Sequence, residues 1–176
     1  MAEDKKPRQR SRTSDINLDT LGLEMGNIPP QALDVEEAVL GALLIEPNCV
    51  DEAMGELTPS CFYSKTNKMI FEAMSALVAE HISLDVISVS QKLKAQDNFD
   101  AVGGAPALVK LSLKVASAAN IEYNCRILKE KCIQRELITA SCKILRESYK
   151  ESANVNDLME MAQTEIYAAI QNNVKR

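Results

Sequence analysis

The sequence predicts an all-α protein, a small globular helical bundle followed by a long antiparallel helical hairpin. Apolar residues make up 46% of the chain, but only 4% are aromatic and Trp is absent, so the core consists mainly of aliphatic side chains and Met, which favour helices. Helix-start signals recur ahead of apolar residues at helical spacing, and a long stretch near the end holds neither Pro nor Gly. A chain of 176 residues suffices for one ordinary domain, or for a smaller domain with an appendage.

Residues 1–27 are predicted to form a disordered tail, because they are polar and show no sustained apolar period. The globular part begins at Ile28, since the two prolines that follow cannot lie deep inside a helix. Asp34 and Glu37 match a capping box, in which Asp34 accepts from the first turn and Glu37 reaches back. A first helix is therefore expected to run from this point to about Glu46.

The next three elements follow from local signals. Pro47 stops the first helix and is suited to open a second one. Thr58-Pro59 is a cap followed by a first-turn proline and predicts a short helical turn. Ser64 is placed to cap a further helix that ends near Glu80.

Two more helices complete the globular part. Asp85 is a cap, although Val86, Ile87 and Val89 are β-formers, so a strand is the competing local interpretation. The helical spacing of the apolar residues that follow favours a helix. Gly103-Gly104 permits positive φ ahead of the second helix, in whose first turn Pro106 is tolerated.

From Ser117 to about Lys150 the absence of Pro and Gly predicts one helix roughly 50 Å long at 1.5 Å per residue. The pattern breaks at residues 151–154, and Asn154 with Asp157 marks the start of a last amphipathic helix. A short break between two such helices predicts an antiparallel hairpin. We therefore expect a globular subdomain at residues 28–116 and a hairpin subdomain at residues 117–176.

The predicted hairpin has more apolar surface than one helix pair can bury, because two helices share a single seam. The excess is expected to form a two-fold interface with the same patch on a second copy. The predicted interface residues are Ile138, Leu145, Tyr149, Leu158 and Met161. The alternative is that the hairpin folds back on the globule and buries this surface internally, which the length of the helix argues against.

No catalytic, cofactor-binding or metal-binding residues are predicted. The sequence lacks the G-x-x-x-x-G-K-[ST] loop of nucleotide-binding proteins, its one His81 has no recognisable partner motif, and its acidic residues lack a metal-loop spacing. Five Cys without a C-x-x-C pair support neither a disulfide framework nor a zinc site, and are expected to be small buried hydrophobes in a reducing compartment. Because no apolar run fits a signal peptide or a membrane span, a cytoplasmic protein without a membrane partner is expected.

The charge distribution bears on nucleic-acid binding. Residues 28–116 carry six basic and twelve acidic side chains, whereas residues 117–150 carry seven basic and four acidic ones. The acidic globule cannot supply the basic face that binding to phosphates requires, so little direct DNA binding is expected. A nucleic-acid-binding accessory domain is the alternative function, motivated by the basic tail and the basic residues of the long helix.

Several short motifs, in order along the chain, resemble the N-terminal domain of the DnaB-type bacterial replicative DNA helicase. They are IPPQALDVEEAVLGALL at 28–44, Phe62-Tyr63, IFEA at 70–73, Leu84-Asp85-Val86, Val102-Gly103-Gly104, SAANI at 117–121, Arg126-Ile127 and RELI at 135–138. The resemblance covers about residues 28–140, and the final hairpin matches in pattern alone. Pro106 and the polar tail before Ile28 depart from the family pattern.

The resemblance implies a non-catalytic collar domain whose hairpin pairs with a neighbour's hairpin. Three such dimers would form a collar above a hexameric motor ring, and the collar would also dock the C-terminal domain of primase. A motor domain that uses ATP and Mg would follow residue 176, so this polypeptide is not expected to unwind DNA or to hold a cofactor.

Overall fold

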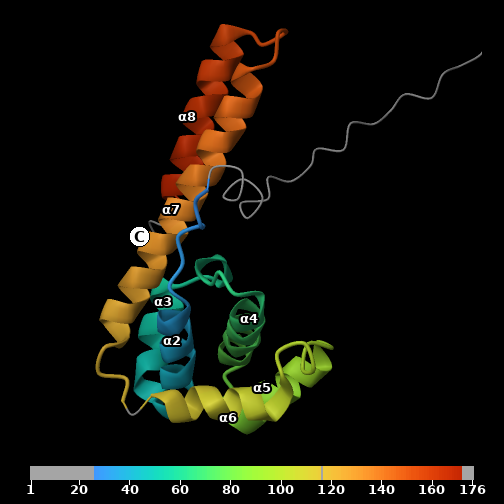
Figure 1. The fold of residues 1–176 in the computed structure, drawn as a ribbon. Helices are drawn as coiled ribbons and strands as arrows, with labels where there is room; N and C mark the ends of the chain where they lie inside the picture. The colour runs from blue at the N-terminus through green and yellow to red at the C-terminus, as the bar shows by residue number, and fades with distance from the viewer. Residues whose placement is uncertain (1–25, 116, 172–176) are drawn as a thin grey trace, which may run out of the picture.

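The computed structural model describes residues 26–115 and 117–171, and within these ranges all regular secondary structure is helical. Figure 1 shows two parts, a globule that contains α2 to α6 and a hairpin of α7 and α8 that projects from it. The predicted all-α architecture is confirmed. The predicted disordered tail falls almost wholly on residues 1–25, outside the described residues.

The first half of the globule follows the local signals of the sequence. Helix α2 (Leu33–Ile45) is followed by a 3₁₀ turn, η1 (Pro47–Cys49), and by α3 (Val50–Glu56). The predicted short turn at Thr58-Pro59 is the 3₁₀ turn η2 (Pro59–Cys61). The Ser64 hydroxyl accepts from the amide of Asn67 at 3.4 Å and caps α4 (Lys65–Ala79), as predicted.

The second half of the globule is also helical, which decides between the two interpretations of the segment after Asp85. The Asp85 carboxylate accepts from the Ser88 amide at 2.7 Å, and the Ser88 hydroxyl accepts from the Asp85 amide at 3.0 Å, a capping box at the start of α5 (Val86–Ala95). Gly103 and Gly104 adopt φ of +91° and +66° ahead of α6 (Gly104–Lys114). The cap at Asp85 and the helical spacing thus outweigh the β-propensity of the residues that follow.

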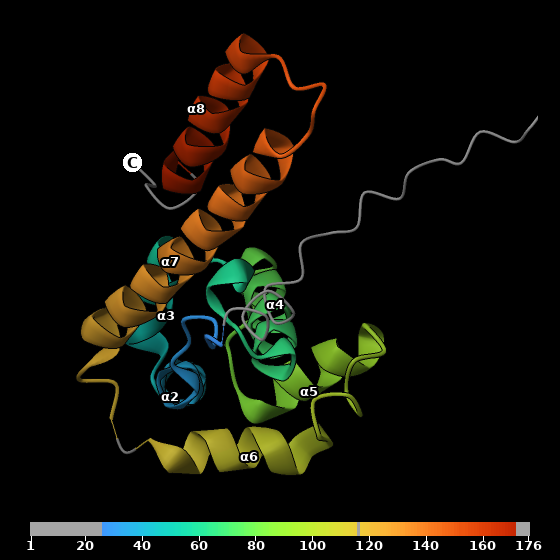
Figure 2. The ribbon, with the colours of Figure 1, turned by 45° about the horizontal axis from the view of Figure 1, so that its top comes forward.

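The globule core lies between α2, α4, α5, α6 and the first half of α7. Its largest fully buried apolar side chains are Phe71, Leu40, Leu43, Ile70, Met74, Leu93, Leu108 and Leu128. Helix α6 runs across one end of the globule (Figure 2) and packs closely on α2 at Gly41, where a Cβ would come within 2.4 Å of the Leu111 carbonyl oxygen. Glycine is therefore needed for the close approach of these two helices.

The capping box expected at Asp34 and Glu37 is wrong. Helix α2 begins at Leu33, and no side chain caps it. Glu37 instead pairs with Lys114 of α6. The neighbouring Glu36 is 0% exposed and accepts hydrogen bonds from residues about thirty positions further along the chain. A charge with such distant partners leaves no local signature in the sequence.

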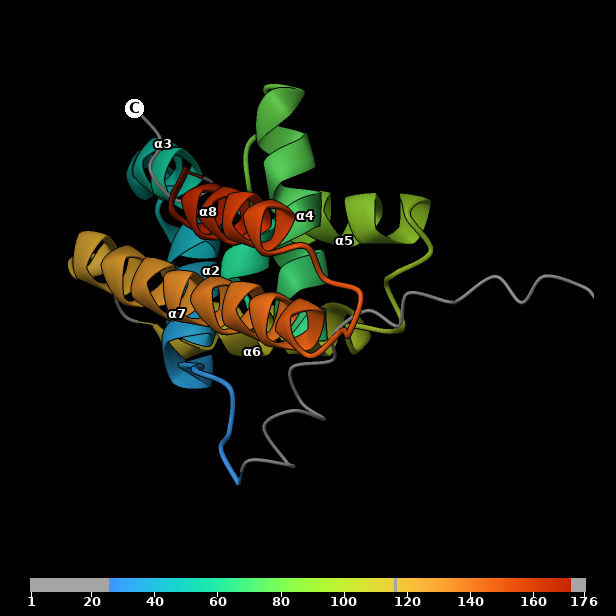
Figure 3. The same ribbon diagram turned by 90° about the horizontal axis from the view of Figure 1, so that it is seen from above.

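The hairpin consists of α7 (Ile121–Ser148) and α8 (Val155–Gln171), which runs back along α7 (Figures 1 and 3). Helix α7 starts four residues later than Ser117 and is about 42 Å long. Its start is delayed because the Ala118 amide donates to the Glu46 carboxylate at 3.1 Å, which ties this segment to the end of α2. The Asn154 side chain accepts from the Asn156 amide at 3.0 Å at the start of α8, the predicted position.

All five Cys are free thiols, four of them buried and Cys142 half-buried, as expected for small hydrophobes. Among the described residues, no group of three or more His, Cys, Asp or Glu side chains is placed to hold a metal ion. Likewise, none of the described helices combines the length and the apolar character needed to cross a membrane.

Candidate functional site

The two halves of α7 have different surroundings. Cys125, Leu128 and Cys132 of the first half are buried in the globule core. Beyond Arg135, the buried side chains of the hairpin are Ala140 and Ala169, one on each helix. Among the described residues, the distal hairpin is therefore held together by contacts between α7 and α8.

The seam between α7 and α8 is made of small and polar side chains. Ala140 and Ala169 are 3% and 5% exposed, and their small size lets the two helices approach closely. Lys143 of α7 donates to Glu165 of α8 at 2.9 Å beside them. Because this seam buries little apolar surface, most large apolar side chains of the hairpin lie outside it.

The structure places the five predicted interface residues on different sides of the hairpin. Leu145 and Tyr149 are 56% and 83% exposed. Ile138 is half-buried. Leu158 and Met161 are also half-buried, and they line a recess at the hairpin tip with Glu147 of α7 and residues of the connection between the two helices. The latter two therefore face the neighbouring helix of their own chain.

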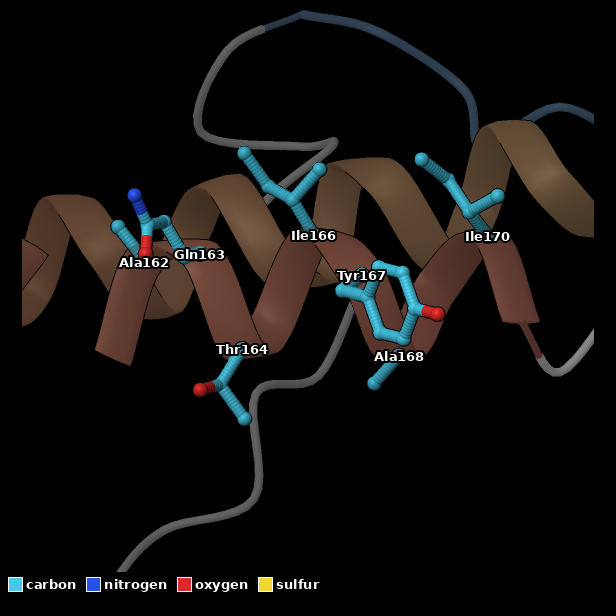
Figure 4. Close-up of a pocket in the computed structure, with 7 residues that line it drawn as sticks. All are labelled: Ala162, Gln163, Thr164, Ile166, Tyr167, Ala168 and Ile170. Carbon is cyan, nitrogen blue, oxygen red and sulfur yellow. The ribbon is translucent and has the colours of Figure 1, made fainter. Parts of the chain in front are cut away.

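Sequence reasoning missed the apolar side chains that α8 does expose. These are Val155, Met159, Ile166, Tyr167 and Ile170. In Figure 4, Ile166 and Ile170 project from the same edge of α8, with Tyr167 beside them, around a shallow recess. The signal was the 4-3-4-4 spacing of the apolar residues Val155, Met159, Ala162, Ile166 and Ile170. The competing set that includes Leu158 and Met161 also contains the charged Glu165.

Helical geometry places part of this apolar set on one side of the hairpin that both helices share. At 100° per residue, Leu137 and Ile144 lie about a quarter turn from the α8-facing side of α7. Their counterparts on α8 are Met159, Ile166 and Ile170, about a quarter to a third of a turn from the α7-facing side and in the same rotational sense. Because the helices are antiparallel, equal rotations bring both sets to the same side, which we call the shared flank. Leu145, by contrast, lies opposite α8.

Several basic residues of α7, and Lys150 just after its end, are engaged within the chain. Lys143 contacts Glu165, Lys150 contacts Glu147, and Lys129 lies 3.9 Å from Glu56 of α3. Arg135 is only 7% exposed. Four of the seven basic residues between 117 and 150 are thus paired or buried, so α7 offers no concentrated basic face to a phosphate backbone.

Comparisons with known proteins agree with the helical architecture. Residues 28–130 match the family model described as the DnaB-like helicase N terminal domain. The replicative DNA helicase DnaB of Rhodothermus marinus is 33% identical over 156 residues, which is 89% of this chain and 16% of that protein. The chain spans about a third or less of the length of the curated relatives it matches.

Two solved structures are similar to this fold. The crystal structure of the N-terminal domain of DnaB helicase from Mycobacterium tuberculosis has a TM-score of 0.75 and 31% identity, and the match covers 80% of this chain and 99% of that one. A DnaB-like replicative helicase, described together with its interactions with primase, has a TM-score of 0.65 and 26% identity over 78% of this chain and 31% of that one.

Proposed function

Since the chain belongs to the DnaB-like helicase N-terminal domain family, we propose that this non-motor domain joins two copies of the chain through its hairpin within a replicative helicase. The observation that carries the proposal is the exposed apolar surface of the distal hairpin. Met159, Ile166 and Ile170 are 59%, 44% and 48% exposed on α8. A helix face of this composition is typical of a protein–protein contact.

We assign the contact to the shared flank because it draws on both helices and presents a broad face. A patch that meets its own copy closes with two-fold symmetry, and burial of each large apolar side chain contributes about 1.5–3 kcal/mol. Leu145 and Tyr149, predicted from the sequence, form the competing face on the other side of α7. The two faces are alternatives, and a charged substitution on each of them decides between the two.

Light scattering over a range of concentrations tests the proposal. The chain should pass from one copy of 19.4 kDa to a particle of twice that mass as the concentration rises. A particle that keeps the mass of one chain at hundreds of micromolar would contradict the proposal, because a contact weaker than about 4–5 kcal/mol would not define the assembly.

For the complete helicase we propose that three such dimers form a collar above a hexameric motor ring in the cytoplasm. Family membership and the hairpin's surplus apolar surface support this arrangement. Cross-linking between hairpins in the full-length protein should yield paired chains within a hexamer. Cross-links between globules alone would argue for another arrangement.

We further propose that the hairpin region docks the C-terminal domain of primase. The support is a structural neighbour described with its interactions with primase. Calorimetry with the two purified domains at tens of micromolar should show binding in the weak-to-moderate range. If no heat of association appears, the docking proposal fails and the dimer proposal is unaffected.

Nucleotide and DNA chemistry are assigned to the motor portion of such a helicase. The sequence has no phosphate-binding loop, and the globule is acidic. Titrations with ATP and with single-stranded DNA at physiological salt should therefore show no appreciable binding. Micromolar DNA binding that survives added salt would instead favour a nucleic-acid-binding accessory domain.

A further inference from the structure

Residues 60–64, which run from η2 to the start of α4 and are called the η2–α4 connector here, lie between two buried charged side chains. From one side, Glu36 of α2 accepts from the Tyr63 amide at 2.6 Å and from the Ser64 amide at 3.3 Å. Its carboxylate also accepts from the Asn67 side-chain amide at 2.9 Å. Glu36 therefore binds the donors of this connector.

From the other side, Arg135 of α7 binds the acceptors of the same connector. Its guanidinium donates to the carbonyls of Ser60 and Cys61, both at 2.9 Å. It also donates to the Pro30 carbonyl at 2.8 Å, and its carbon lies 5.8 Å from the centre of the Tyr63 ring. One side chain thus joins α7 to the start of the fold and to the η2–α4 connector.

Neither charge has an ion-pair partner among the described residues. Each is stabilised by peptide dipoles instead, the carboxylate by amide donors and the guanidinium by carbonyl acceptors. A buried charge that loses such partners is strongly destabilised, so each side chain holds the connector in one geometry. The planar five-donor guanidinium suits three carbonyls in a way that a Lys ammonium does not.

Arg135 stands where α7 leaves the globule. The last residue of α7 in the globule core is Cys132, and from Ala140 onward the buried contacts of the helix are with α8. Apolar packing is non-directional and tolerates a small rotation of a helix, whereas three directed hydrogen bonds do not. Arg135 therefore adds three directed bonds to the apolar packing of α7 at the point where the helix leaves the globule.

We propose that Arg135 is the positioning residue that sets the direction in which the hairpin leaves the globule, with Glu36 holding the connector to which Arg135 binds. Without Arg135, both parts keep their folds and the hairpin pivots about the end of the globule core. The contacts of Glu36 and Arg135 lie within one chain, so this proposal does not depend on whether the hairpin pairs with a second copy. If hairpins assemble, Arg135 would set the position of each globule relative to the paired hairpins.

Residual dipolar couplings from weakly aligned protein test this proposal, because they report the relative orientation of rigid parts. In the unmodified chain, amides of α2 to α6 and amides of the distal hairpin should fit one alignment tensor. In Arg135→Met, each part should still fit by itself, but the two should require different tensors. Arg126→Met, at an exposed position of the same helix, is the matched control and should behave like the unmodified chain.

Arg135→Lys is the second variant, and the same measurement is made on it if Arg135→Met does not fold. It keeps the charge and the aliphatic stem but not the three directed bonds, so it should also require two tensors. Hydrogen exchange at the Tyr63 and Ser64 amides should rise several-fold more in Glu36→Gln than in either Arg135 variant. The proposal is overturned if the folded Arg135 variants keep one tensor with the orientation of the unmodified chain.

Discussion

The globule and the distal hairpin are made of the same kinds of helix-forming residues, yet they differ in how many of their large apolar side chains are buried. In the globule, α2 is surrounded by other helices, and Leu40 and Leu43 on it are buried. In the distal hairpin, each helix has one neighbour, and Leu145 and Ile166 stay exposed. Burial is thus decided by the number of helices that meet and not by composition, and a two-helix hairpin leaves part of its apolar surface exposed.

The largest predicted difference between the two parts is in the unfolding free energy lost when an aromatic residue of each is replaced by alanine. Phe71→Ala in the globule should lower the free energy of unfolding by about 3–5 kcal/mol, because it empties a filled site in the core. Tyr149→Ala at the hairpin tip, where the ring is 83% exposed, should change it by less than about 0.5 kcal/mol. Urea unfolding of both variants measures the difference, and similar losses would erase the distinction between the two parts.

A second prediction compares the effect on stability of replacing two glycines of the globule, Gly41 and Gly55, with alanine. Gly41→Ala should destabilise the fold by about 1–3 kcal/mol, because its Cβ would collide with the Leu111 carbonyl and force α2 and α6 apart. Gly55→Ala in α3 meets open space and should stabilise by about 0.5–1 kcal/mol. Thermal unfolding should therefore move the two midpoints in opposite directions. A shift of both in one direction would mean that the α2–α6 crossing is not tight.

A third prediction uses Cys125, where α7 enters the globule core. Burial, together with the nearby charges of Glu56 and Glu52, raises the pKa of this thiol from 9.0 to about 12. The folded state therefore holds its proton above pH 9, where the unfolded state loses it. The stability that the neutral thiol contributes is present below pH 9 and is lost as the pH rises toward about 12.

Between pH 9 and 11, the unmodified chain should accordingly lose about 1.4 kcal/mol per pH unit more than Cys125→Ala. Urea unfolding at several pH values gives both slopes, and other titrating groups cancel in their difference. Equal slopes for the unmodified chain and Cys125→Ala would show that Cys125 is not shielded from water.

What the sequence could predict depends on how far apart the interacting residues lie. The caps at Ser64 and Asp85 bind residues three positions away, so a short window contains the whole signal. Glu36 binds residues 27 to 31 positions away and Arg135 binds residues 74 to 105 positions away, so neither role has a local pattern.

The hairpin shows the same limit in its apolar residues. Periodicity identified α8 as amphipathic, but the sequence allowed several apolar faces along this helix. Only the position of α7 decides which of these faces points inward. Leu158 and Met161 were therefore assigned to the outer surface, whereas they line a recess against α7. Small residues such as Ala140 and Ala169 were the available clue to the seam, because helices approach closely where side chains are small.

Sedimentation of three aspartate variants tests most directly the claim that the hairpin, and not the globule, joins two chains. Ile166→Asp on the shared flank should shift the chain from dimer to monomer with its helicity intact, because it places an unpaired charge in the contact. Leu113→Asp, at an 80% exposed leucine of the globule, should remain dimeric, as should Leu145→Asp on the opposite side of α7. A dimer that survives Ile166→Asp but is lost in Leu145→Asp would move the contact to the outer face of α7, and one lost only in Leu113→Asp would contradict the account.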